Sequence, residues 1–234
     1  MVEEYKGTLG IDTEAGDIVD ENLTISLQPQ TSVVVMDQYT GQVKAIVGGR
    51  GTKTTSLSLN RATDSPRQPG SCFKVLSTYA PGLNECGMTL ATTIKDEPYR
   101  YATGQQVNNW DGRYIGLARV RYAIEHSMNV CAVRTLTETV GLEKGYQYLQ
   151  KFGFTTLVNN DPDYPGQTDI AQATALGGIT RGVYNIEMTA AYAAIANGGV
   201  YTEPILYTEI LDHDGNVLID NTEPETHEVI KDTT

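Results

Sequence analysis

The stretch Arg67-Gln-Pro-Gly-Ser-Cys-Phe-Lys74 carries the strongest signal in the sequence. Pro-Gly is a turn signal, and the apolar residues of 73–79 then recur at the spacing of one helical face. In a helix that begins near Ser71, the Ser71 hydroxyl and the Lys74 amine lie one turn apart on the same face. A desolvated lysine that loses its proton can serve as the base that a serine nucleophile needs. The same spacing also arises by chance on a solvated helix, so this pair alone leaves both interpretations open.

A second polar motif, Ser127-Met-Asn129, falls in a short break between two predicted helices. A hydroxyl and a carboxamide two residues apart in a tight loop can face one cavity, where the hydroxyl relays a proton and the carboxamide holds a substrate amide. Serine and asparagine are also frequent helix caps, and by itself this ordinary role is the favoured interpretation.

Predicted strands lie at both ends of the chain, and predicted helices fill the middle. Two β-branched runs, 32–36 and 42–47, flank a Gly-ended connection and predict a hairpin, whose first strand should be buried on both faces. A loop is expected over 48–60, and a second hairpin over 205–211 and 216–220. Apolar spacing predicts helices from Ser71 onward and over 117–125, 130–139, 142–152 and 185–196. This order predicts an α+β fold rather than alternating βαβ units.

The composition excludes several classes of protein. The chain has 234 residues, is 40% hydrophobic and carries a formal net charge of −12, which argues against disorder and against broad nucleic-acid binding. Its apolar runs are too short to cross a bilayer. Three Cys without a CxxC pair and three scattered His give no metal-ligand spacing. We therefore expect no metal and no cofactor.

Together the two polar motifs resemble the Ser-x-x-Lys and Ser-x-Asn motifs of penicillin-binding proteins and serine β-lactamases. The surrounding sequence is similar to the transpeptidase domain of class A, bifunctional penicillin-binding proteins, in family order from about Thr31 to Asp220. The stretches that carry this similarity are 34–41, 45–49, 60–63, 67–71, 109–114, 127–130, 175–178 and 190–199. The resemblance implies the penicillin-binding-protein and serine β-lactamase fold, with a mostly helical body and an incomplete antiparallel sheet.

The resemblance also implies a role for each motif residue. Ser71 is the nucleophile that peptidoglycan stem peptides ending in D-Ala-D-Ala acylate, and Lys74 is its base. Ser127 passes protons between Lys74 and the leaving amine, and Asn129 binds the substrate backbone. An amine on a second stem peptide then takes the acyl group, whereas a β-lactam leaves Ser71 acylated. Trp110 is expected either at the rim of the cleft, where it binds substrate, or in a packing role within the loop 109–114.

The sequence departs from the family pattern at the third motif, Lys-Thr-Gly or Lys-Ser-Gly. None of the eight Lys is followed by Thr-Gly or Ser-Gly. We therefore expect residues 31–234 to be a partial transpeptidase domain, residues 1–30 a linker or peripheral segment, and acylation by this piece to be slow. The resemblance implies a parent protein that is anchored in the bacterial cell membrane, faces outward, carries a glycosyltransferase domain and works with other cell-wall synthesis proteins.

Two other functions remain open from the sequence. One is a serine β-lactamase or D,D-carboxypeptidase; the stretches 67–70 and 109–114, which match the synthases better, weigh against the β-lactamase. The other is a non-catalytic β-lactam sensor or scaffold of the same fold. Among the remaining polar residues, His126 is expected to make a local polar contact rather than to pair with Ser127, and Cys72 and Cys131 are expected to be buried free thiols.

Overall fold

The computed structural model describes residues 29–53 and 55–234, and the strands and helices of these residues all belong to the unit Thr31–Thr234. The predicted linker at 1–30 lies outside the described residues apart from its last two. The strands are β1 (Val33–Met36), β2 (Val43–Val47), β3 (Thr93–Asp96), β4 (Tyr99–Arg100), β5 (Gln106–Val107), β6 (Gly116–Arg119), β7 (Val200–Thr202), β8 (Glu209–Leu211), β9 (Val217–Asp220) and β10 (Thr226–Glu228). The helical segments are the 3₁₀ turn Gly70–Cys72, the π-helix Lys74–Tyr79, α2 (Ala80–Glu85), α3 (Val120–Glu125), α4 (Asn129–Thr135), the π-helix Leu136–Val140, α5 (Leu142–Lys151), the 3₁₀ helix Gln172–Leu176 and α6 (Asn185–Ala196).

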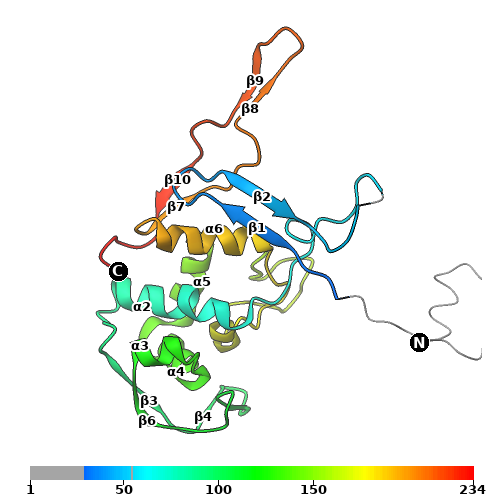
Figure 1. Cartoon of the computed structure of the whole chain (residues 1–234). Helices are drawn as coiled ribbons and strands as arrows, with labels where there is room; N and C mark the ends of the chain where they lie inside the picture. Colours follow the sequence, from blue (N-terminus) through cyan, green and yellow to red (C-terminus); the bar gives the residue numbers. More distant parts are fainter. Residues whose placement is uncertain (1–28, 54) are drawn as a thin grey trace, which may run out of the picture. The chain divides into compact units, whose positions relative to one another are not determined.

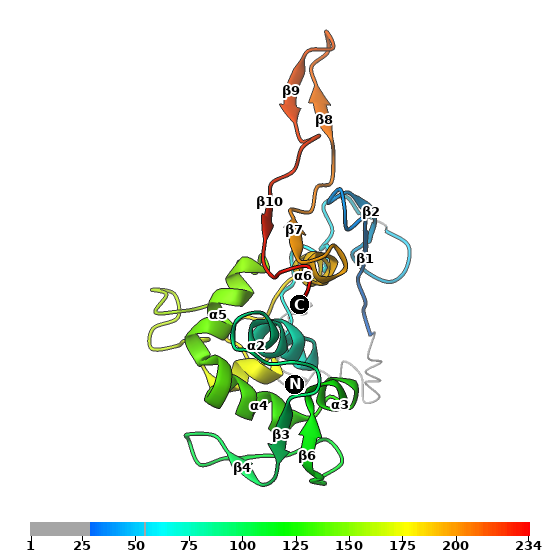
Figure 2. The same cartoon turned by 90° about the vertical axis from the view of Figure 1, so that its left-hand side faces the viewer.

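The strands of the described residues pair in five separate two-stranded antiparallel sheets. The predicted hairpin at 32–47 forms as β1 and β2, with Val33 opposite Val47 and Val35 opposite Ala45. Helix α6 packs against β1 and also against β7, which pairs with β10 (Figure 1). The hairpin β8–β9 and the sheet β3–β6 lie at opposite ends of the unit in both views (Figure 2).

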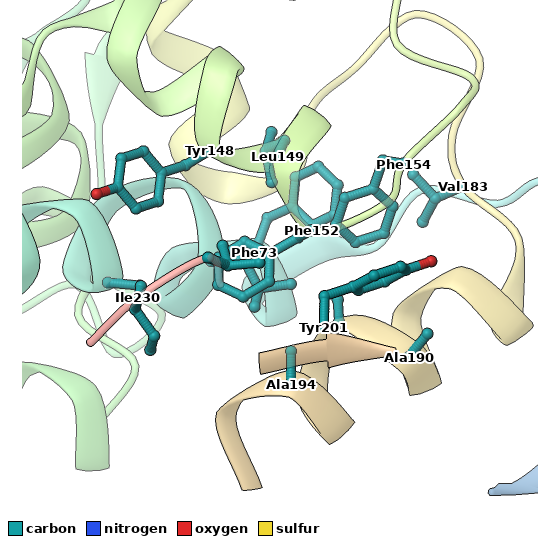
Figure 3. Packing of buried hydrophobic residues seen from close by; sticks show 14 of the residues in the cluster. Phe73, Tyr148, Leu149, Phe152, Phe154, Val183, Ala190, Ala194, Tyr201 and Ile230 are labelled. Carbon is teal, nitrogen blue, oxygen red and sulfur yellow. The ribbon is translucent and has the colours of Figure 1, made fainter. Parts of the chain in front are cut away.

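The core has two parts, and the segment 70–85 contributes to both. Phe73, Leu76 and Ala80 belong to a cluster with α5, α6 and the aromatic residues that follow α5 (Figure 3). There the ring of Phe73 lies 4.9 Å from that of Phe154. Tyr79 instead belongs to a second cluster, which α3 and α4 dominate. Because burial of one large apolar side chain stabilises a fold by about 1.5–3 kcal/mol, the two clusters fix segment 70–85 firmly in place.

Alanines let α6 fit between two sheets. Ala190, Ala191 and Ala194 are buried, and their small side chains allow strands to approach the helix closely. Helix α6 has the bounds that the apolar spacing predicts, and α5 agrees to within one residue. The mixture of helices and small antiparallel sheets confirms the α+β fold.

Three local predictions are wrong. Val33 and Val35 are about half exposed, since only the face of β1 that carries Val34 meets α6. Residues 117–119, expected to be helical, belong to β6, which pairs with β3 before α3 begins at Val120. Residues 205–208, expected in a strand, precede β8.

Candidate active site

The chain reaches Ser71 through a glycine turn. Gly70 has a φ of +56°, a conformation that suits glycine, and it starts the 3₁₀ turn Gly70–Cys72. Ser71 is exposed in this first turn. Lys74 follows one turn later as the first residue of a π-helix, a form of helix that occurs frequently at functional sites. Lys74 is only 3% exposed, because the segment is packed between the two core clusters.

Contacts with the segment 177–183 hold the turn before Ser71 in place. Arg67 and Val183 exchange both backbone hydrogen bonds at 2.9 Å. The Gln68 side chain pairs with the backbone of Ile179: its Nε2 donates to the carbonyl at 2.6 Å, and its Oε1 accepts from the N–H at 3.0 Å. Gly177 lies against Gly70, so closely that a Cβ at Gly177 would be 2.4 Å from the Gly70 backbone. These contacts set the position of the turn that carries Ser71.

The second polar motif lies in the break between α3 and α4. Ser127 has a φ of +50°, the left-handed conformation that costs a non-glycine residue about 1–2 kcal/mol. The next residue, Met128, is buried, and its N–H donates to the carbonyl of Ala123 at 2.9 Å. Non-glycine residues in this conformation concentrate at functional sites. The strained backbone turns two Ser127 oxygens, Oγ and the carbonyl, toward Lys74.

Lys74 joins the two motifs through three hydrogen bonds. Its Nζ donates to Ser127 Oγ at 2.9 Å, to the Ser127 carbonyl at 2.5 Å and to Asn129 Oδ1 at 2.6 Å. In the described part of the chain, no carboxylate forms an ion pair with Lys74. Burial lowers the pKa of Lys74 to about 8. The three oxygens thus hold the ammonium in place, while burial makes the loss of its proton easier than in water.

The structure brings together three of the residues that the motifs single out, Lys74, Ser127 and Asn129. Ser71 lies on the same helical segment as Lys74, one turn before it, and its hydroxyl makes no hydrogen bond to another described residue. Trp110 is 79% exposed, so it lies outside both core clusters. It lines a small surface hollow with His126 and Tyr122. Its role in binding substrate remains a prediction.

Among the other polar residues, the structure confirms two predictions and corrects one. His126 makes a local contact: its Nδ1 lies 3.0 Å from the carbonyl of Tyr122, and the two rings stack at 3.8 Å. Cys131 is a buried free thiol, and burial raises its pKa to about 12. Cys72, expected to be buried, is exposed because it lies beside Ser71 in the first turn, which faces solvent.

Two buried polar residues near the second motif were not identified as functional from the sequence. Asn109 is 6% exposed, and Asp96 is fully buried. Asn109 binds the start of α4, and Asp96 binds Asn109. Asn109 lies in one of the stretches that carry the family resemblance, but nothing in the sequence pattern around Asp96 marks it.

Comparison with known families identifies the chain. The penicillin binding protein transpeptidase domain matches residues 31–234. The chain belongs to this family. It is 38% identical to penicillin-binding protein 1A of Clostridium novyi over 203 residues, which cover 83% of this chain and 22% of that protein. It is also 38% identical to penicillin-binding protein 1F of Bacillus subtilis over 192 residues, which cover 82% of this chain and 25% of that protein. The chain thus spans about a quarter of the length of these relatives.

Solved structures share the fold of this transpeptidase domain. Penicillin-binding protein 1A of Haemophilus influenzae matches with a TM-score of 0.68 and 31% identity, over 84% of this chain and 28% of that one. PonA1 of Mycobacterium tuberculosis, in complex with penicillin V, matches with a TM-score of 0.72 and 23% identity, over 87% of this chain and 52% of that one. These matches confirm the fold expected from the resemblance. None of the helices described in the structure has both the length and the apolar character needed to cross a bilayer.

Proposed function

We propose that this domain is a serine-type D,D-transpeptidase of peptidoglycan synthesis. The observation that carries the proposal is the buried Lys74 amine, one helical turn after Ser71 and hydrogen-bonded to both Ser127 and Asn129. A serine needs a base within reach, and this lysine has a pKa lowered to about 8. The family membership supports acyl transfer as the reaction class.

The first half of the reaction forms an acyl-enzyme. Ser71 Oγ attacks the carbonyl carbon of the penultimate D-Ala, and its proton passes to neutral Lys74. As the C–N bond breaks, Ser127 delivers a proton to the leaving amine and recovers one from Lys74, so that the terminal D-Ala departs as a neutral amine. The N–H of Ser71, in the first helical turn, has no intrahelical acceptor and can bind the oxyanion.

The second half transfers the acyl group. An amine of a second stem peptide attacks the ester carbon, its proton moves through Ser127 to Lys74, and Ser71 Oγ leaves and takes a proton back from Lys74. A β-lactam undergoes the first half alone: Ser71 opens the lactam ring, but the released nitrogen stays tethered to the acyl group and blocks the acceptor. Asn129 and the exposed Trp110 are proposed to bind the peptide donor.

The proposal extends to the whole protein. We infer that it is anchored in the bacterial membrane with this domain on the outer face, that it also carries a glycosyltransferase domain, and that its partners are stem peptides, β-lactams and other cell-wall synthesis proteins. The relatives named penicillin-binding protein 1A support this inference.

The test uses the full-length protein with a donor peptide ending in D-Ala-D-Ala and an amine acceptor. We expect D-Ala release and cross-linked product, no product with Ser71→Ala, and a rate lower by about 10²–10⁴-fold with Lys74→Ala, the usual contribution of a general base. Undiminished D-Ala release by Ser71→Ala would overturn the mechanism. Release of D-Ala without cross-linking would instead indicate a D,D-carboxypeptidase, and absence of acylation would indicate a sensor or scaffold.

A further inference from the structure

Asn109 makes four hydrogen bonds from a loop that is separate from both catalytic motifs. Its Oδ1 accepts from the backbone N–H groups of Asn129 at 3.0 Å and Val130 at 3.2 Å. Its Nδ2 donates to Asp96 Oδ1 at 2.8 Å and to the carbonyl of Arg113 at 2.9 Å. A carboxamide can accept two hydrogen bonds and donate two, so the side chain of Asn109 is fully used.

These contacts give α4 a cap from outside its own sequence. Met128, the residue that precedes α4, makes no capping hydrogen bond with its side chain. The first N–H groups of a helix lack intrahelical partners, and Asn109 satisfies two of them at the start of α4. Asp96 holds Asn109 in this orientation, because its carboxylate can only accept and therefore faces Nδ2 rather than Oδ1. The other oxygen of Asp96 accepts from the N–H of Ile115 at 2.9 Å.

The same loop also orients the side chain of Asn129. Nδ2 of Asn129 donates to the backbone carbonyl of Asn108 at 2.8 Å. This bond turns Oδ1 of Asn129 toward Lys74, to which it lies at 2.6 Å. Residues 108 and 109 thus fix both the backbone and the side chain of Asn129, and through them one of the three oxygens around the Lys74 amine.

We propose that Asn109, held by the buried carboxylate of Asp96, is a positioning residue that places Asn129 and Ser127 against Lys74 for acyl transfer. This inference rests on the proposed function. A displacement of catalytic groups by about 1 Å can cost 10²-fold in rate, so the loss of Asn109 acts on the chemical step and not only on folding.

The test measures acylation of the full-length protein by a fluorescent penicillin, as a rate constant at saturating drug and as a final labelled fraction. Misfolding lowers the labelled fraction, whereas misplacement of Lys74 and its acceptors lowers the rate constant. Asn109→Ala is expected to lower the rate constant at least 10-fold. The matched control is Asn84→Ala, which removes three hydrogen bonds, to Tyr148, Lys231 and Thr234, at the far end of α2. The control should keep the wild-type rate constant.

An exchange of Asn109 and Asp96 tests whether the acylation rate recovers when the hydrogen bond between them is restored in the opposite direction. Asn109→Asp alone sets two carboxylates against each other and should be at least as slow as Asn109→Ala. With Asp96→Asn added, residue 96 can donate to residue 109 and still accept from Ile115, while residue 109 still caps α4. A carboxylate at residue 109 cannot donate to the carbonyl of Arg113, so the double variant should recover part of the lost rate and clearly exceed Asn109→Asp.

The outcomes separate the two proposals. A wild-type rate constant in Asn109→Ala, or a loss equal to that of Asn84→Ala, would overturn the positioning role. If Asn109→Ala does not fold, failure of the double variant to exceed Asn109→Asp in rate would do the same. Wild-type protein that penicillin does not acylate at Ser71 would instead overturn the proposed function.

Discussion

At the scale of the single residue, burial and hydrogen bonding have opposite effects on the charge of Lys74. Burial disfavours its charge and lowers its pKa to about 8, while three oxygens from Ser127 and Asn129 accept hydrogen bonds from the ammonium. At pH 7 a group with a pKa of 8 is neutral in about one molecule in ten. An ordinary lysine would be neutral in fewer than about one in a thousand. Lys74 therefore has a much larger neutral fraction near neutral pH than an ordinary lysine, as the proposed role of general base requires.

This pKa predicts the pH dependence of acylation. The rate constant should rise with pH and reach half its maximum near pH 8, because the neutral amine is the base and its fraction increases through the pKa. Stopped-flow labelling with a fluorescent penicillin between pH 6 and 10 measures this profile. Lys74→Arg, which stays charged throughout, should lose the rise along with most of the rate. A flat profile, or a rate constant that still rises tenfold per pH unit up to pH 9, would show that Lys74 with its lowered pKa is not the base.

The sequence makes some site residues visible and hides others for a physical reason. Ser71 lies three residues before Lys74, and Ser127 lies two residues before Asn129. Each pair therefore falls within a short window of sequence, where its spacing can be recognised. Asp96 and Asn109 act on α4 across more distant parts of the chain. The hydrogen bonds of Asp96 and Asn109 form only when β3 and the loop after β5 fold against the start of α4, so no local sequence pattern reveals them. Trp110 follows Asn109 directly, but its exposure could not be read from sequence.

At the scale of elements, the Ser71 turn depends on its packing against the segment 177–183. Gly177 ends the helix Gln172–Leu176 with a φ of +74° and approaches Gly70 without a side chain between them. Gln68 and Arg67 add side-chain and backbone hydrogen bonds to the same segment. A change at Gly177 should therefore shift Ser71 without altering a residue of either polar motif.

Gly177→Ala tests this coupling. The substitution places a Cβ 2.4 Å from the Gly70 backbone, so the turn must move, and we expect the acylation rate constant to fall by about 10–100-fold. Gly166→Ala is the matched control, since Gly166 also has a φ of +74° but its Cβ would meet nothing within 4 Å. Both variants should lose about 1 kcal/mol or more in the free energy of unfolding from backbone strain. Equal acylation rates in the two variants would show that the contact between Gly177 and Gly70 does not position Ser71.

Elements were predictable where a pattern runs over several turns or across a clear hairpin signal. Helices α5 and α6 and the hairpin β1–β2 formed as expected. Strands β4, β5, β7 and β10 have two or three residues each and contain too little sequence to show a period. The apolar spacing predicts a helix at residues 117–119 because these residues run directly into α3. Pairing with β3 makes them part of a strand instead.

At the scale of the whole molecule, the hairpin β1–β2 leaves one face uncovered. Val33, Val35 and Val47 are each about half exposed on the face opposite α6, and within the described residues β1 and β2 pair as a two-stranded sheet. The α+β class was predictable from the order of the patterns, but burial of β1 on both faces was not correct. A run of valines reports the tendency to form a strand, not the number of faces that other elements cover.

An exposed apolar face with open strand edges favours association between copies of the chain. At tens of micromolar, we expect this 234-residue chain to form oligomers that light scattering coupled to size exclusion detects. Val35→Lys should shift it toward the monomer, because a charge in this face opposes pairing. Tyr39→Lys, which adds the same charge in the exposed turn between β1 and β2, is the control and should leave the oligomers in place. A monomeric wild-type chain would contradict this prediction.

The central claim is that Ser71 is the residue that is acylated, and peptide mapping after penicillin treatment of the full-length protein tests it most directly. Trypsin cleaves after Arg67 and Lys74, so one peptide holds Ser71 as its only hydroxyl, and a separate peptide, from Tyr122 to Arg134, holds Ser127. Ser71→Ala distinguishes the hydroxyl from the neighbouring exposed thiol of Cys72. We predict one penicillin mass on the first peptide and none after Ser71→Ala. Adduct on the Ser127 peptide, or adduct that persists in Ser71→Ala, would contradict the claim.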